Sequence, residues 1–282
     1  PSGGWIVNVK ESAGGKTTSK TYVAKSLVIA SGGFTADRKR CARIDPSLTA
    51  EVHTTANPYG TVWDGATSEI LDAAQAVGAA VTDGFGLQLL PFWGGRLRDY
   101  DGGDIYVNAA GERFVNESPP WKLITDKMLD LEDRNCRVIT DARSHKGAML
   151  GLKLINGIVY KADTIEEMAS RMHVPFPVLK KTIETYNKSV DKGYDEATGK
   201  TIFSQRIEQP PFYFGRELIY VHTTLDGIRT DEHARVLSVQ GVPMQGLFVG
   251  GEIAGGIFGT DRQGGASMTN CLVMGRRAGK NA

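Results

Sequence analysis

The chain has 282 residues, of which 41% are hydrophobic and 23% charged, and its formal net charge is +1. This composition predicts a sizeable core with more than one lobe and excludes the strong positive field of a nucleic-acid-binding protein. Cys41, Cys136 and Cys271 form no CxxC pair, and the histidines show no HExxH spacing, so neither a disulfide framework nor a metal site is indicated. No apolar run approaches the roughly 18 residues of a membrane span, and we expect a soluble protein, cytoplasmic or periplasmic.

The first elements in chain order are strands. Trp5–Lys10 alternates apolar and polar residues, and residues 21–25 form a second strand after the turn at Gly14-Gly15. Leu27–Ala30 is a short continuous apolar run, which is typical of a strand covered on both faces. It ends in Ser31-Gly32-Gly33, and glycines at a strand end let a backbone approach a ligand closely.

The middle of the chain mixes helices and strands. Residues 66–78 predict an amphipathic helix with one apolar face, formed by Ile70, Leu71, Ala74 and Val77. Residues 105–108 and 113–115, joined by a turn at Gly111, predict a hairpin. A capping box at Thr164–Glu167 predicts the start of one helix, residues 175–189 predict another, and the polar run 191–200 predicts a loop.

Strands return in the last part of the chain. Residues 236–239 and 247–249 predict strands, and the second runs directly into Gly250-Gly251-Glu252. After Arg262 and the pair Gly264-Gly265 a final helix begins, for which we expect Met268, Cys271 and Leu272 to be buried. A helix start beside a cation suits an anion, such as the N1/C2=O edge of a reduced flavin.

Each of these features also has a purely structural interpretation. Glycine after a strand is often only a turn, and Arg262 next to a capped helix is often only a surface residue. A single histidine such as His222, or an amide such as Gln88 within an apolar run, is usually a structural residue. The sequence contains no GxSxG elbow and no GxGxxG motif, so hydrolase chemistry is disfavoured and the usual dinucleotide fingerprint is absent from these residues.

The order of the motifs resembles that of a known family over nearly all 282 residues. The matching segments include AKSLVIASGGF (24–34), WDGATSEILDAAQAVGA (63–79), IYVNAAGERFVNE (105–117), TTLDGIRTDEHARVL (223–237) and GLFVGGEIAGGIFGTDRQGGAS (246–267). Together and in this order they resemble the fumarate reductase/succinate dehydrogenase flavoprotein superfamily, particularly the flavocytochrome c-type fumarate reductases and their enoate-reducing relatives.

The resemblance implies an α/β fold: part of a Rossmann-like FAD-binding lobe with an inserted capping domain of the α+β type. Residues 1–60 would form the first part of the lobe, 61–221 the capping or substrate domain, and 222–282 the C-terminal part of the lobe. The implied cofactor is FAD. The residues that would contact it are Ser31, Gly32, Gly33, Asp64, Gly65, Gly251, Glu252, Gly264, Gly265, Ala266 and Ser267.

The implied substrate site departs from that of the fumarate reductases. Leu90 stands where the family has a substrate-binding histidine, and Trp121 stands where it has the arginine proton donor. Arg262 is retained and would grip a substrate carboxylate or carbonyl. Substrate contacts are expected from Gln88, Leu90, Trp121 and Thr223, and the candidate proton donors are Lys122, Tyr100, Arg98 and His222. These departures predict a larger, less charged substrate than fumarate.

The resemblance also implies partners and leaves alternatives open. The family's N-terminal nucleotide-binding segment would be supplied in cis or as a second chain, so residues 1–282 alone are expected to bind FAD weakly. An electron-donor protein or domain would accompany the small-molecule substrate. We expect an FAD-dependent oxidoreductase that acts on an activated C–C bond. The alternatives are a ketosteroid-dehydrogenase-like flavoprotein and a non-catalytic binding remnant.

Overall fold

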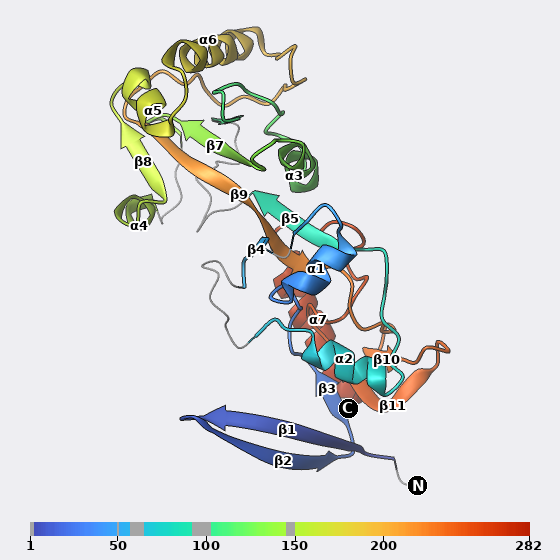
Figure 1. Ribbon diagram of the computed structural model, residues 1–282. Coiled ribbons are helices and arrows are strands. Elements are labelled where there is room, and N and C mark those ends of the chain that lie inside the picture. Colours follow the sequence, from blue (N-terminus) through green and yellow to red (C-terminus); the bar gives the residue numbers. More distant parts are fainter. Residues whose placement is uncertain (1–2, 50, 57–64, 92–102, 145–149) are drawn as a thin grey trace. The chain divides into compact units, whose positions relative to one another are not determined.

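The computed structural model describes residues 3–49, 51–56, 65–91, 103–144 and 150–282 (Figure 1). Asp64, Arg98 and Tyr100, three of the predicted site residues, lie outside this part. The helices are α1 (Arg38–Ile44), α2 (Glu69–Ala76), α3 (Trp121–Leu129), α4 (Leu150–Ile155), α5 (Ile165–Met172), α6 (Phe176–Lys192) and α7 (Ala266–Asn281). The strands are β1 (Trp5–Ala13), β2 (Lys16–Ala24), β3 (Leu27–Ile29), β4 (His53–Thr54), β5 (Leu87–Pro91), β6 (Asp104–Val107), β7 (Asn135–Thr140), β8 (Val159–Ala162), β9 (Phe212–Thr224), β10 (Arg235–Leu237) and β11 (Pro243–Val249).

The chain divides into two compact units. The first comprises Pro1–Asn57, Thr61–Gln88 and Val221–Ala282, and the second comprises Pro58–Gly60 and Leu89–Tyr220. Residues 61–88, which the sequence analysis assigned to the capping segment, therefore cluster with the first unit. The reason lies in α2, whose Leu71 and Ala74 pack into the same core as Ile29 and Val249.

The sheet of the first unit joins the two strands that end in glycine. Its order is β10-β11-β3, and β11 pairs with β3 in parallel, with Leu247 opposite Leu27 and Val249 opposite Ile29. Figure 1 shows these two strands side by side. Because parallel strands point the same way, both Gly-Gly segments leave the sheet at one edge. The fold thus brings residues 31–33 and 250–252 to the same place.

One face of β3 is less covered than the sequence indicated. Ile29 is buried in the core, but Val28 is 41% exposed and Ala30 is also exposed. Alternate residues of a strand point to opposite faces, and among the described residues only the Ile29 face packs against a core. The described residues therefore cover only one of the two faces that the apolar run 27–30 offers.

The strands β1 and β2 form an antiparallel ribbon that turns at Gly14-Gly15. The cross-strand neighbours Ile6 and Val23 are both strongly exposed. The indole N–H of Trp5 donates a hydrogen bond to the backbone oxygen of Gln245, 3.2 Å away. A two-stranded ribbon is marginally stable in water without a covering layer. This anchor adds to the cross-strand contacts within the ribbon, such as the Lys20–Glu11 ion pair.

Two predicted helix faces are wrong. On α7 the buried residues are Asn270, Met274 and Ala278, which recur every four residues, whereas Met268 and Leu272 are each 68% exposed and Cys271 is exposed. On α2 only Leu71 and Ala74 are buried, and Ile70 and Val77 lie on the exposed side. The reason is shared: each helix contacts its core along a stripe one residue wide, narrower than the apolar face that its sequence offers.

The second unit packs helices against a sheet. β9 pairs antiparallel with β7 and β8, and β7 pairs with β6. The core contains Ile105, Ile139, Leu179, Ile183 and Tyr186, which come from β6, β7 and α6. The predicted capping box opens α5: the Thr164 hydroxyl accepts a hydrogen bond from the Glu167 N–H at 3.0 Å. The second strand predicted for the hairpin, at 113–115, does not form, and a single bridge between Val107 and Arg113 takes its place.

A buried group of four charged residues also lies in this unit, and we name it the Lys200 cluster: Arg113, Glu117, Asp195 and Lys200. Glu117 accepts from Arg113 Nε at 2.9 Å and from Lys200 Nζ at 2.9 Å, and Arg113 also pairs with Asp195. The Lys200 side chain is 0% exposed. Burial alone would raise the pKa of Glu117, but the charges of Lys200 and Arg113 lower it. The predicted loop 191–200 thus supplies two buried charges.

Candidate functional site

Gly33 and Glu252 meet at the edge where β3 and β11 end. A Cβ atom added at Gly33 would lie 2.1 Å from Glu252 Oε1 and 2.4 Å from Thr224 Oγ1. At these distances an added side chain would displace the Glu252 carboxylate and the Thr224 hydroxyl, so the arrangement seen here depends on glycine at position 33. The glycine that the sequence associates with a ligand therefore has a defined role: it lets the Glu252 carboxylate reach the start of the loop after β3.

Thr224 holds the carboxylate of Glu252. Its backbone N–H and its hydroxyl both donate to Glu252 Oε1, at 3.0 and 3.1 Å. Within the described ranges the hydrogen bonds to this carboxylate all go to Oε1, which leaves Oε2 for a ligand hydroxyl. Burial raises the pKa of Glu252, and the bonds from Thr224 and the charge of Arg262 oppose that rise. Thr224 has a polar role that the sequence analysis missed, because a buried threonine in a strand carries no distinguishing pattern.

Arg262 and Gln88 form a second polar pair in the same unit. Arg262 is 8% exposed, and its Nε–H donates to Gln88 Oε1 at 3.1 Å. Gln88 Nε2 donates to the backbone oxygen of Arg262 at 2.6 Å and to Asp261 Oδ1 at 2.8 Å. The fold thus brings together Gln88, at the start of β5, and Arg262, in the loop before α7, which are 174 positions apart.

The start of α7 is an open helix N-terminus. Gly265, its N-cap residue, has a φ of +86°, and the helix has no side-chain cap. Gly264 and Gly265 are exposed, with open space where a Cβ would project. Asn270 Nδ2 donates to the backbone oxygen of Gly251 at 3.2 Å, which ties this helix to the end of β11. Free backbone N–H groups and the helix dipole suit an anionic or polar ring edge here.

The remaining predicted residues are divided between the two units. His222 Nδ1 lies 3.1 Å from Thr55 Oγ1, and Thr223 is buried beside it on β9. The second unit holds the buried Leu90, together with Trp121 at the first position of α3. Lys122 is 58% exposed and pairs with Asp126 one helical turn away at 3.0 Å, which is the ordinary arrangement of a surface lysine. Ser31, Gly32 and Gly65 lie in loops of the first unit.

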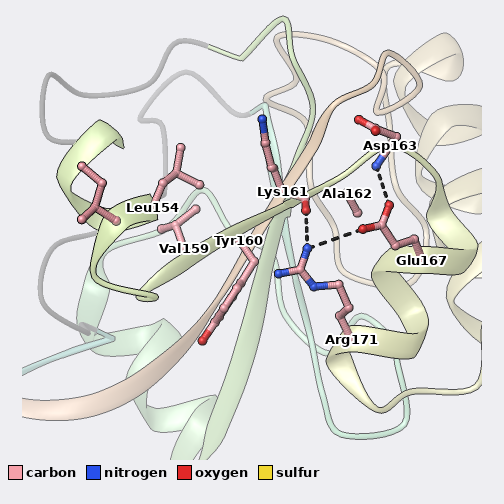
Figure 2. A pocket seen from close by; sticks show the side chains of 9 residues that line it. Leu154, Val159, Tyr160, Lys161, Ala162, Asp163, Glu167 and Arg171 are labelled. Carbon is pink, nitrogen blue, oxygen red and sulfur yellow. Dashed lines mark hydrogen bonds and ion pairs between the residues drawn. The ribbon is translucent and has the colours of Figure 1, made fainter.

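A separate hollow of about 540 Å³ lies in the second unit, between α4, β8 and α5 (Figure 2). Arg171 donates to the Lys161 backbone oxygen at 2.6 Å and pairs with Glu167 at 3.5 Å. Its guanidinium also lies over the Tyr160 ring, 5.2 Å from the centroid. Arg171 and Glu167 are thus paired with each other, so neither presents a free charge to a ligand in this hollow.

Two further features concern the part of the chain that the structure describes. No group of three or more His, Cys, Asp or Glu residues there could hold a metal ion. No helix there is long and apolar enough to cross a membrane.

Comparison with known proteins places this arrangement in a family. Residues 4–268 match the model of an FAD binding domain. The chain is 30% identical to the acrylate reductase flavoprotein subunit of Shewanella woodyi, over 91% of this chain and 53% of that protein. It is similar to the open conformation of a flavocytochrome c3 fumarate reductase, with 28% identity, a TM-score of 0.72, and coverage of 93% of this chain and 47% of that one.

A solved structure of a ketosteroid dehydrogenase is also similar. The 3-ketosteroid-delta4-(5alpha)-dehydrogenase of Rhodococcus jostii RHA1 matches with 25% identity, a TM-score of 0.62, and coverage of 97% of this chain and 55% of that one. The chain thus spans about half the length of the proteins it resembles. The cofactor implied by the sequence is confirmed as FAD, since the matched model describes its binding. With the match covering nearly all of its residues, the chain belongs to the family of FAD-binding domains.

Proposed function

We propose that this chain holds the ring end of FAD and the substrate in an enzyme that reduces, or forms, an activated C=C bond of a small organic molecule. One observation supports this most strongly: the glycine ends of β3 and β11 lie together beside Glu252, with the Gln88–Arg262 pair in the same unit. Such a reaction needs three things from the protein: a backbone that the cofactor can approach closely, an acceptor for a cofactor hydroxyl, and a buried cation.

The residues present fit FAD. Glu252 Oε2 would accept a ribityl or ribose hydroxyl while Thr224 keeps the carboxylate in place. The open start of α7 at Gly264 and Gly265 would face the polar edge of the flavin ring. Hydride transfer at N5 is the chemistry that bound flavin supplies. Asp64 and Gly65, which match the family's sequence, complete the proposed set of cofactor contacts.

Arg262 would bind and polarise the substrate. Its Nε–H is occupied by Gln88, and its two terminal nitrogens have no hydrogen-bond acceptor among the described residues, so both are available to a carboxylate or carbonyl oxygen. A buried guanidinium next to a helix start stabilises negative charge that develops on that oxygen as the hydride adds. The acid that protonates the neighbouring carbon is sought among Lys122, Tyr100, Arg98 and His222.

The substrate proposed is not fumarate. Leu90 and Trp121 remove an imidazole and a cation from the positions that match the fumarate site, so a second carboxylate would lack its partners. A substrate with one anionic or carbonyl group and a larger apolar part suits these residues. The similarity to a ketosteroid dehydrogenase favours a second candidate, oxidation of a ketosteroid-like substrate. A non-catalytic binding remnant is the third candidate.

The pyrophosphate of FAD would be held by a segment outside these 282 residues, in cis or as a second chain. The sequence contains no GxGxxG, and Val28 of β3 and the Ile6/Val23 face of the β1–β2 ribbon are exposed. We therefore propose that residues 1–282 alone bind FAD weakly. The FAD-binding lobe would comprise residues 1–60 and 222–282, together with the residues of 61–88 that cluster with them, and the rest of residues 61–221 would form the cap. An electron-donor protein or domain would reduce the flavin.

The test is a substrate screen on the complete flavoprotein, in which oxidation of pre-reduced flavin is followed under anaerobic conditions. We expect turnover of mono-carboxylate enoates or enones and negligible turnover of fumarate. Fumarate turnover near the enzyme median of about 10 per second would refute the substrate proposal. Arg262→Gln should lower kcat/KM roughly a hundredfold without loss of flavin. Lost flavin with normal activity per remaining flavin would make Arg262 a cofactor residue instead.

A further inference from the structure

The side-chain amide of Gln88 is occupied by the protein itself. Gln88 is 4% exposed, and its Nε2 donates both to the Arg262 backbone oxygen and to Asp261 Oδ1. Its Oε1 accepts from Arg262 Nε. Asp261 Oδ1 in turn accepts from the Arg262 backbone N–H at 2.9 Å. The backbone and the side chain of Arg262 are therefore fixed by one amide, with Asp261 as a brace.

This arrangement orients Arg262 without neutralising it. A carboxylate at position 88 would also accept from Nε, but it would form an ion pair with the guanidinium and compete with an anionic ligand. A neutral amide fixes the plane of the guanidinium and leaves its full positive charge for the two terminal nitrogens. Because both donor bonds of the Gln88 amide are already made, its capacity to bind a substrate directly is small.

We propose that Gln88 is a positioning residue that acts through Arg262, rather than a direct substrate ligand. The proposal rests on the proposed role of Arg262 as the substrate-binding cation. It replaces the substrate contact that the sequence suggested for Gln88, and it makes the identity of residue 88 a determinant of how strongly Arg262 attracts an anionic group.

Two substitutions in the complete flavoprotein separate orientation from charge. Gln88→Met keeps the side-chain length and removes every hydrogen bond, so we expect kcat/KM to fall about 10- to 100-fold through a misplaced Arg262. Gln88→Glu keeps the Nε acceptor and adds a negative charge, so we expect its loss to appear mainly as a raised KM for anionic substrates. Gln75→Met, on the exposed side of α2, is the matched control and should leave both constants unchanged.

A double-mutant cycle with Arg262→Met tests whether Gln88 acts through Arg262. If it does, Gln88→Met will lower kcat/KM by less than threefold in a protein that already lacks Arg262. If Gln88 binds substrate itself, or only stabilises the fold, the two losses will multiply and the proposal is wrong. Flavin content and the thermal midpoint, measured on the same proteins, show whether any variant has simply failed to fold, in which case Gln88→Glu carries the test.

A ligand-free crystal structure of the Gln88→Met protein gives a readout that does not depend on activity. We expect the Arg262 guanidinium to occupy more than one conformer, or a new one. An unchanged, single conformer would overturn the proposal. The failure of the underlying function is distinguishable: if Arg262→Met leaves turnover intact, the proposed role of Arg262 is wrong, whereas a severe Arg262→Met defect beside a harmless Gln88→Met overturns only the role of Gln88.

Discussion

Lys200→Met tests whether the Lys200 cluster stabilises the second unit. The substitution removes a fully buried ammonium that lies 2.9 Å from Glu117 Oε2 and 5.7 Å from the centroid of the Tyr186 ring. Removing one partner of a buried ion pair costs about 3–5 kcal/mol, because the other charge is left in a dry environment. Arg113 still contacts both oxygens of Glu117, so we expect the lower end, roughly 3 kcal/mol.

The assay is thermal unfolding of the full chain, followed by circular dichroism. At about 2–4 °C per kcal/mol, the expected fall in the midpoint is roughly 6–12 °C. Lys180→Met is the matched control, since Lys180 belongs to an exposed pair with Glu184 on α6 and should change stability by less than about 0.5 kcal/mol. Adding Glu117→Gln to Lys200→Met removes the uncompensated charge and should recover part of the loss.

The pH dependence gives an independent check. The pKa of Glu117 is lowered below its ordinary 4.5 in the folded chain. A lowered carboxyl pKa contributes stability that is present above the ordinary value and is lost as the pH falls through the folded one. The gap between the wild type and Lys200→Met should therefore close in acid. A gap below 1 °C at neutral pH, or one that widens in acid, would refute the reasoning.

Two other substitutions test the glycine edge of the first unit. Gly33→Ala places a Cβ against Glu252 and should lower flavin content in the complete protein at least tenfold. Gly275→Ala is the control, because its added methyl group would project into open space on α7, and it should leave flavin content unchanged. Equal flavin content in the two variants would contradict the steric argument. Glu252→Gln removes a carboxyl group whose pKa is raised on folding. Such a group lowers the free energy of unfolding, and it does so increasingly as the pH rises above the ordinary pKa of 4.5. The stability of Glu252→Gln relative to the wild type should thus increase between pH 4 and pH 7, and a pH-independent difference would count against it.

The two glycine-ended strands were the most predictable part of the site. Apolar runs that stop at Gly-Gly predicted β3 and the end of β11, and the family resemblance implied that Glu252 contacts FAD and that Arg262 contacts the substrate. The hydrogen-bond partners were not predictable, because nothing local distinguishes Thr224 from its neighbour Thr223, or shows that Gln88 faces Arg262. Such pairs join residues that are not sequence neighbours: 28 positions separate Thr224 from Glu252, and 174 separate Gln88 from Arg262.

Burial was predicted least well. The apolar faces of α2 and α7 are wider than the stripes that pack, so Ile70, Val77 and Met268 were assigned to cores that they do not enter. The opposite error concerned Asp195 and Lys200, which lie in a polar run that is typical of a solvated loop. They are buried because they form ion pairs with Glu117 and Arg113, and a hydropathy pattern does not show which charges pair.

The parallel pairing of β3 with β11 has a consequence for the order of folding. Leu247 pairs with Leu27, which lies about 220 positions earlier. Closing so long a loop has a high entropic cost while the intervening chain is disordered, and much less once that chain has condensed. We therefore expect the β6–β7–β9 sheet to form first and the edge that carries Gly33 and Glu252 to assemble late. Pulse-labelling hydrogen exchange would detect this as protection in β7 before β3, and simultaneous protection would contradict it. Substitutions in the core of the second unit would then slow folding and lower the yield of assembled sites, although they contact no residue at the edge that carries Gly33 and Glu252.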